Sequence, residues 1–297
     1  MGTALELAQE DIEDMLKGII IPSPPQIIAD LQLEMAMPDP DMSAIASLIT
    51  KDAALAGSVL KVINSPFYSV SSINSIQQAV MMLGINTIAN LVTAVQLREM
   101  SVYANDMTEE NQLVFNRFWD SAEDVAKCCM LIAKRISYLE PDIAYMLGLF
   151  HNTGIPLLIH KYPNYLSVIS RSYQMKEGRT IDVENNAFNT NHAVIGYYVA
   201  RSWKLPNIIS QAIADHHNSR HIFTHQPEAN NEKIAYIALL KIAEHIAGIH
   251  LVLGNQETDF EWQAIHTDVL DYLHFTESDY EDIVCDAQEL GIGNYLL

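Results

Sequence analysis

Four histidines in the second half of the chain are of the type that binds transition metals. They are His151, His192 and the adjacent pair His216 and His217. Glu244 follows on a later predicted helix. Imidazoles and carboxylates that a helical bundle brings together can bind divalent metal ions. A carboxylate that bridges two such ions helps to activate water for attack on a phosphoester. The residue types are therefore compatible with a site for divalent metal ions, although a single buried histidine is more often structural.

The stretch 148–154, Gly-Leu-Phe-His-Asn-Thr-Gly, carries only half of a bridging doublet. An aspartate after His151 would bridge two ions, but Asn152 stands there. An asparagine side chain offers one neutral oxygen and two N–H donors, so it cannot compensate the charge of two cations. A purely structural reading is also open, in which His151 bonds a helix-end carbonyl or Asn152. His216 and His217 would then favour a helix C-terminus through their interaction with its dipole.

The elements that must position these residues are predicted to be helices. Apolar residues recur at helical spacing almost everywhere, and no convincing alternation of period two occurs. The pattern predicts helices over residues 26–37, 85–100, 110–136, 142–150, 163–176, 192–203, 234–253, 260–273 and 278–290. Asp52 and Ser75 are expected to cap two further short helices. We therefore expect an all-α helical bundle with an additional N-terminal helical subdomain.

The polar segment 101–110 is the predicted boundary between two subdomains. Residues 1–105 would form the N-terminal subdomain, and residues 106–297 would form a second helical subdomain with its C-terminal extension. The extension after Leu253 is acidic and aromatic, and we expect it to pack on the bundle. Residues 218–231 are expected to form a mobile loop. Six methionines of the first subdomain are expected to fill gaps in the core, with an adaptable partner surface as the alternative: Met35, Met37, Met42, Met81, Met82 and Met100.

Composition restricts the partners. The chain has 17 basic and 37 acidic residues, a formal net charge of -20. Such an acidic surface repels nucleic acid and anionic lipid, so we expect neither as a partner. Three cysteines without framework spacing favour a reducing compartment. No signal peptide is recognisable at the N-terminus, and the most apolar long stretch, 234–253, carries charged residues. These features predict a cytoplasmic protein without membrane insertion.

The ordered set of motifs resembles the HDOD (HD-related output domain) family, a branch of the HD/PDEase metal-dependent phosphohydrolase superfamily. The resemblance covers residues 18–247. It implies an HD-domain-like helical bundle over residues 106–297, with the N-terminal helical subdomain in addition. In the first half it rests on Ile21-Pro22-Ser23-Pro24-Pro25, residues 49–55, residues 62–68 and Met82-Leu83-Gly84. In the second half it rests on Phe118-Trp119, residues 148–151, residues 192–196, residues 203–206 and His216-His217.

The resemblance implies which residues occupy the superfamily's catalytic positions. The first histidine position falls on Ser121, and the His-Asp doublet becomes His151-Asn152. The middle histidines are kept as His192 and as His216 or His217, and the final acid falls on Glu244. Serine is a far poorer ligand than imidazole, so two ligands of a dinuclear centre are lost. Asp120, Asp124 and Asp215 are near enough in sequence to substitute.

We therefore expect a bacterial signal-transduction output or scaffold module that is catalytically inactive and acts through contacts with a signalling protein. We expect no cofactor. If a divalent metal ion is retained, it is weakly held, with His151, His192, His216 and His217 as its ligands. Two alternatives stay open: a metal-dependent phosphohydrolase with a degenerate site, and a vestigial pocket that senses a ligand without turnover. No receiver, diguanylate cyclase or EAL segment is recognisable, so the input and the partner are expected from other chains.

Overall fold

The computed structural model describes residues 14–68, 73–100, 109–225 and 231–293. Helices supply the regular secondary structure of these ranges, and no strand occurs in them. The predicted all-α fold is confirmed. By their mutual contacts, the described residues of Ser23–Asp106 form one compact unit, and those of Met1–Pro22 and Met107–Leu297 form another. Most of the predicted boundary segment, 101–110, lies outside the described residues.

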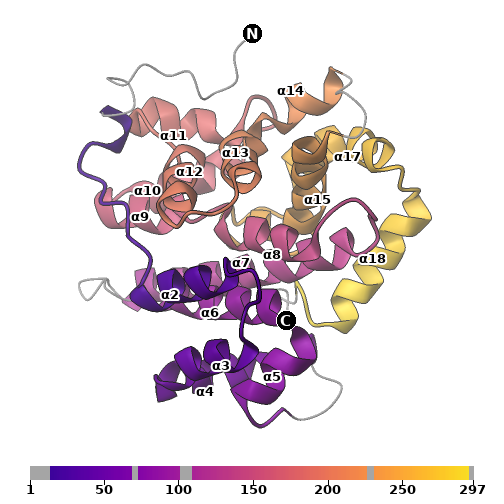
Figure 1. The fold of residues 1–297 in the computed structure, drawn as a ribbon. Helices are drawn as coiled ribbons and strands as arrows, with labels where there is room; N and C mark the ends of the chain where they lie inside the picture. Colours follow the sequence, from indigo (N-terminus) through magenta and orange to yellow (C-terminus); the bar gives the residue numbers. More distant parts are fainter. Residues whose placement is uncertain (1–13, 69–72, 101–108, 226–230, 294–297) are drawn as a thin grey trace. The chain divides into compact units, whose positions relative to one another are not determined.

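The smaller unit contains five described helices, drawn from indigo to purple in Figure 1: α2 (Gln26–Met35), α3 (Met42–Thr50), α4 (Ala53–Ile63), α5 (Ile76–Leu83) and α6 (Ile85–Met100). Three of them begin at a side chain that accepts a hydrogen bond from a backbone N–H of the first turn. Asp41 caps α3, Asp52 caps α4 and Ser75 caps α5. Each cap satisfies donors that the helix itself leaves free.

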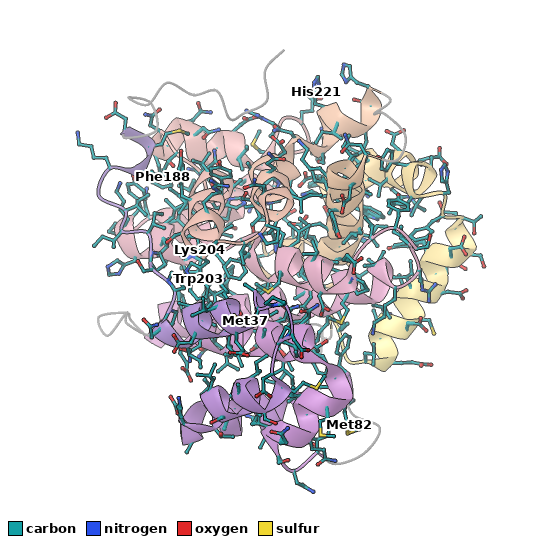
Figure 2. The ribbon with its side chains drawn as sticks, viewed as in Figure 1. Met37, Met82, Phe188, Trp203, Lys204 and His221 are labelled. Carbon is teal, nitrogen blue, oxygen red and sulfur yellow. The ribbon has the colours of Figure 1, made fainter. Side chains whose placement is uncertain are left out.

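Four of the six methionines that were predicted to fill the core of the smaller unit are exposed instead. The core is formed by branched aliphatic side chains such as Ile45, Ile49 and Val59, which are fully buried. Four methionines are instead exposed by 45–69%: Met37, Met42, Met81 and Met82. Figure 2 labels two of them, Met37 and Met82. The core-filling prediction is wrong for these four. Met42, Met81 and Met82 lie on solvent-facing sides of α3 and α5, and Met37 lies beyond the end of α2.

The larger unit contains α7 (Glu109–Ala133), α8 (Pro141–Phe150), α9 (Gly154–Lys161), α10 (Tyr165–Tyr173), α11 (Thr180–Phe188), α12 (His192–Ser202), α13 (Asn207–Asp215), η2 (His216–Asn218), α14 (Ser219–Thr224), α15 (Glu232–Ile246), α16 (Ile249–Val252), α17 (Phe260–Leu273) and α18 (Glu277–Glu289). Its central element is α15, which contacts α7, α8, α13 and α17 (Figure 1). Residues 235–244 of α15 are all buried, including Lys241 and Glu244. Two charged side chains are thereby placed inside the unit.

Three predictions for this unit need correction. The single helix expected over 234–253 is two helices, because Gly248 adopts a left-handed conformation (φ 70°) that ends α15. The loop expected over 218–231 contains η2 and α14, while 226–230 lie outside the described residues. Two helices, α9 and α11, were not predicted. Their short apolar stripes are typical of helices that tertiary packing stabilises.

The segment before the smaller unit groups with the larger one. The backbone carbonyl of Pro22 accepts hydrogen bonds from the Trp203 indole N–H (3.2 Å) and the Ser202 hydroxyl (3.1 Å). Trp203 is fully buried and packs edge-on against Phe150. This division differs from the sequence-based scheme, which placed the segment in the N-terminal subdomain.

Among the described helices, none alone combines the length and apolar character needed to cross a membrane. The consecutive helices α3 and α4 meet the criterion only together, and they are bent by 114°.

Candidate metal centre

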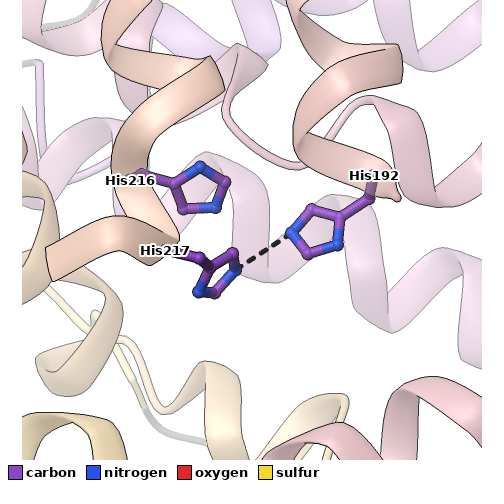
Figure 3. A group of neighbouring side chains, drawn as sticks. All are labelled: His192, His216 and His217. Atoms are coloured by element: carbon purple, nitrogen blue, oxygen red, sulfur yellow. Dashed lines mark hydrogen bonds between the residues drawn. The ribbon is translucent and has the colours of Figure 1, made fainter. Parts of the chain in front are cut away.

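Helix ends and one helix start bring the four histidines together. His151 is the residue after α8, His192 opens α12, and His216 and His217 form the turn η2 that follows α13. All four are buried, with at most 2% of their surface exposed. Figure 3 shows His192 facing His217, with His216 beside them. One ring nitrogen from each of these three lies within 4.8 Å of the other two.

A glycine allows the His151 turn to approach His192 closely. The first residue of α9 is Gly154, and a Cβ atom there would lie 2.1 Å from the backbone oxygen of His192. Real carbon and oxygen atoms do not approach so closely, so any other residue would push the start of α12 away. The Gly at the end of the 148–154 motif is thus explained by the position that it gives to two histidines.

Two histidines are oriented by backbone carbonyl groups. His151 Nδ1 lies 2.6 Å from the oxygen of Gly148, and His216 Nδ1 lies 2.6 Å from the oxygen of Ile213. A carbonyl only accepts, so both Nδ1 atoms carry the proton. The Nε2 atoms of both rings are buried and have no hydrogen-bond partner among the described residues, although His151 Nε2 lies 3.4 Å from a carboxylate oxygen of Glu244. The structural reading of His151 is therefore correct for one ring nitrogen and leaves the other unexplained.

His192 is oriented by a buried carboxylate. Glu184 on α11 contacts His192 Nδ1 at 2.8 and 2.9 Å, accepts from the His192 backbone N–H at 2.7 Å, and accepts from the Tyr165 hydroxyl at 2.7 Å. Burial acts to raise the pKa of Glu184, but His192 and Tyr165 outweigh it and lower the pKa. Glu184 is therefore ionised and can only accept, so His192 Nδ1 carries the proton.

His217 is held by a second carboxylate. Its Nδ1 lies 3.1 Å from Oε2 of Glu261, whose other oxygen accepts from the Ser219 hydroxyl at 2.6 Å. Burial opposes ionisation of Glu261, but Lys241 and His217 lower its pKa. Histidines that bind metals commonly donate Nδ1–H to a carboxylate or carbonyl in this way, which fixes the tautomer and presents Nε2 to the ion. All four histidines follow that pattern.

The Nε2 atoms of His192 and His217 face each other at 3.0 Å. Because both Nδ1 atoms donate to carboxylates, two neutral rings would bring two unprotonated lone pairs together. Such a contact is repulsive unless a proton or a metal ion lies between or beside the two nitrogens. Burial, as the largest cause, lowers the pKa of His217, which disfavours an added proton.

A lysine neutralises the carboxylate side of the pocket. Lys241 Nζ lies 2.8 Å from Glu244 Oε2 and 3.2 Å from Glu261 Oε1, and only 4% of the lysine side chain is exposed. The other oxygen of Glu244 lies 3.4 Å from His151 Nε2. Burial acts to raise the pKa of Glu244, but Lys241 and then His151 lower it to about 2. Both glutamates are therefore ionised at neutral pH.

The two predicted substitutions occupy different surroundings. Ser121 is buried on α7, and its hydroxyl donates to the oxygen of Phe118 in the same helix, so it is not presented as a ligand. Asn152 is buried, and neither atom of its amide has a hydrogen-bond partner in the described part of the chain. Asp215 pairs with Lys233, and Asp124 accepts from the backbone of Gly293, so each of these two acids has another partner.

The model of the HDOD domain matches residues 21–219. The chain belongs to the HDOD family. An uncharacterized protein of Treponema pallidum is 27% identical over 221 residues, and the Bacillus subtilis protein YuxH is 28% identical over 134 residues. These alignments cover 73% and 44% of the HDOD chain but only 41% and 30% of the relatives, so the chain spans less than half of their length.

Solved structures share the fold. The HDOD domain protein of unknown function from Geobacter sulfurreducens superimposes with a TM-score of 0.68 at 21% identity, over 97% of this chain and 98% of the other. A candidate phosphohydrolase from Shewanella amazonensis gives a TM-score of 0.66 at 22% identity, over 93% and 95%. The expected HD-like fold with its N-terminal helical subdomain is thereby confirmed.

The donor set of the HDOD pocket fits one metal ion better than two. Three or four unprotonated Nε2 atoms suit a single transition metal. A second ion would need a bridging carboxylate, and Asn152 offers none. It would also meet the Lys241 ammonium, which lies beside the carboxylates of Glu244 and Glu261.

Three residues of the pocket were missed by the sequence reasoning. Glu184 lies on the unpredicted helix α11, and Glu261 lies in the extension beyond the family motifs. Lys241 did carry a signal, because a charged residue three positions before Glu244 in an otherwise apolar helix is expected to be paired.

Proposed function

We propose that this HDOD chain is a signal-transduction module that acts through protein contacts and does not turn over phosphoesters. The observation that carries the proposal is the position of the Lys241 ammonium, between the carboxylates of Glu244 and Glu261. The Lys241 ammonium already neutralises negative charge of these two carboxylates, which a second divalent ion would otherwise balance.

The chemistry of phosphoester hydrolysis supports this conclusion. A two-metal site stabilises both the attacking and the leaving oxygen, and a single ion without a bridging carboxylate lacks that clamp. The HDOD pocket replaces the bridging acid by Asn152, and Ser121 directs its hydroxyl to its own helix. The candidate phosphohydrolase from Shewanella has the same fold, but fold alone does not carry an activity.

Exposed methionines of the smaller unit support a role in protein contacts. Met81 and Met82 on α5 and Met42 on α3 are 45–69% exposed. Methionine is flexible and polarizable, so it suits surfaces that adapt to a partner. This is the alternative that the sequence left open for these residues.

The test is a hydrolysis assay of the full chain with Mn²⁺, using a cyclic dinucleotide and a nucleotide as substrates. We expect no hydrolysis above that of the buffer with metal. The matched variants are His151→Ala, in the pocket, and His160→Gln, on the exposed end of α9. Hydrolysis that depends on the wild-type protein, is lost in His151→Ala and survives in His160→Gln would overturn the proposal.

A second candidate function, a non-catalytic site for one transition metal ion, is favoured by a specific observation. The facing Nε2 atoms of His192 and His217 need a cation near them, and the buried Nε2 of His216 has no other partner in the described chain. A bound ion could be structural, or it could couple the pocket to a signal.

Anomalous diffraction from crystals soaked in zinc tests this candidate. We expect a peak among the Nε2 atoms of His192, His216 and His217. Glu184→Gln should weaken the peak, because removing a carboxylate that orients a metal-binding histidine typically costs about 10–100-fold in affinity. No peak at saturating zinc would exclude the metal site and leave the first proposal standing.

A further inference from the structure

A second cluster of metal-ligand residues lies where the chain leaves α15. His245 is in the last turn of α15, His250 is on α16, and Asp259 is the residue before α17. The left-handed turn at Gly248 reverses the chain between the two histidines. These residues lie beyond position 219, where the match to the HDOD model ends. His250 and Asp259 also lie beyond residue 247, where the motif resemblance ends.

Two distances in the cluster are close to those between the ligand atoms of a tetrahedral site. Oδ2 of Asp259 lies 3.0 Å from Nδ1 of His245 and 3.5 Å from Nδ1 of His250. One atom from each of the three residues lies within 4.8 Å of the others. A tetrahedral zinc ion with bonds of about 2.0–2.1 Å holds its ligand atoms about 3.3 Å apart. Small side-chain shifts would bring all three atoms to an ion.

Ordinary hydrogen bonding does not satisfy the cluster. Asp259 uses Oδ1 to cap α17, accepting from the Trp262 N–H at 3.0 Å, so Oδ2 is the oxygen that faces the histidines. Nδ1 of His245 makes one hydrogen bond with it, at 3.0 Å. His250 is only 7% exposed, and its Nδ1 has no hydrogen-bond partner among the described residues. A buried imidazole nitrogen without a partner is costly unless something binds there.

Neighbouring rings and a small cavity complete the site. The rings of His245 and Trp262 are stacked at 5.2 Å, and those of His245 and His250 are nearly parallel at 5.6 Å. A partly open cavity of about 20 Å³ is lined by Tyr173, His250, Asp259 and Trp262, and also by Lys241, Glu244 and Glu261, so it borders the carboxylate side of the histidine centre as well. That volume is enough for one water molecule, which could be a fourth ligand.

We propose that His245, His250 and Asp259 bind one divalent transition-metal ion, with zinc as the probe, through two Nδ1 atoms and one carboxylate oxygen. The ion would join the end of α15, α16 and the start of α17. This site is separate from the histidine centre and does not depend on the function proposed for it, because no ligand is shared. The two sites also differ in ligand atom, since the histidine centre presents Nε2 and this one presents Nδ1.

The decisive experiment is a zinc anomalous map from crystals of the full chain, with any affinity tag removed. We expect a peak within bonding distance of the His245 and His250 Nδ1 atoms and the Asp259 oxygen. The peak should be lost in His250→Gln and in Asp259→Asn, whose amide oxygen can still cap α17. It should persist in His274→Asn, which removes an exposed imidazole from a left-handed position that asparagine tolerates.

Long-range ¹H–¹⁵N spectra of the histidine rings give a second readout in solution and keep the test decisive if a variant fails to crystallise. On adding zinc, the Nδ1 resonances of His245 and His250 should shift to the positions of metal-bound nitrogens. Apparent zinc affinity for these two signals should fall at least tenfold in Asp259→Asn. No peak at saturating zinc, a peak only at the histidine centre, or a peak that survives both ligand variants would overturn the proposal.

Discussion

The pocket has an imidazole side, formed by the four histidines, and a carboxylate side, formed by Glu244 and Glu261. The polar groups of the two sides are satisfied in different ways. Each histidine donates its Nδ1–H to a carbonyl or carboxylate and leaves Nε2 for an ion. The carboxylates of Glu244 and Glu261 instead share the ammonium of Lys241. One side is thus arranged to receive a cation, and the other side already contains one. The difference teaches that the loss of a metal doublet need not leave the whole pocket without function.

The largest expected effect comes from removing the internal cation. Lys241→Met leaves Glu244 and Glu261 ionised and buried without their partner, and breaking a buried ion pair in this way costs about 3–5 kcal/mol. Urea unfolding of the metal-free protein measures the loss. Adding Glu244→Gln to Lys241→Met should recover part of it, since one uncompensated charge is removed. A loss below about 1 kcal/mol for Lys241→Met would show that the carboxylate side does not depend on the lysine.

On acidification, the carboxylate side and the imidazole side should lose their contributions to stability in different pH ranges. The pKa of Glu244 is lowered to about 2 from an ordinary value of 4.5, chiefly by Lys241 against the effect of burial. A depressed carboxylate pKa contributes stability that is present above pH 4.5 and is lost as the pH falls toward 2. At about 1.4 kcal/mol per unit, the loss from Glu244 is on the order of 3 kcal/mol.

The imidazole side responds at higher pH. Burial, with a contribution from His217, lowers the pKa of His216 well below 6.5. Below pH 6.5 His216 is protonated in the unfolded chain but not in the folded protein, so the free energy of unfolding begins to fall there. Unfolding of the metal-free protein by urea at pH 7, 5.5, 4 and 3 should show both phases. In Lys241→Met the lower phase should flatten more than the upper one, because Lys241 adds only in part to the lowered pKa of His216, after burial and His217. Equal flattening of both would contradict the separation.

Sequence patterns predicted what depends on neighbours in the chain. The caps at Asp52 and Ser75, the helix 260–273 and the end of α8 at His151 follow from local spacing, and the structure has them. The break at Gly248 was missed because the apolar pattern continues through it. The methionines were assigned to the core because composition alone does not say which face of a short helix is covered.

Only part of the site could be predicted, because local sequence patterns do not describe contacts between distant helices. The four histidines and Glu244 could be named from motif order, and the structure brings them together. Glu184 and Glu261 act through contacts between helices that no local pattern describes. The orientation of each ring depends on what its Nδ1 touches, and for His192 that partner lies eight residues away on another helix.

The smallest expected effect is a control on ion-pair burial. Arg135 pairs with Asp286 as Lys241 pairs with Glu244, but the Arg135 and Asp286 side chains are 30% and 46% exposed. Water solvates both groups when the pair is broken, so Arg135→Met should cost less than about 1 kcal/mol. Urea unfolding under the conditions used for Lys241→Met makes the two losses comparable. A similar loss in both variants would mean that the missing stem contacts of the long side chain, and not the buried charge of the glutamates, explain the effect at Lys241.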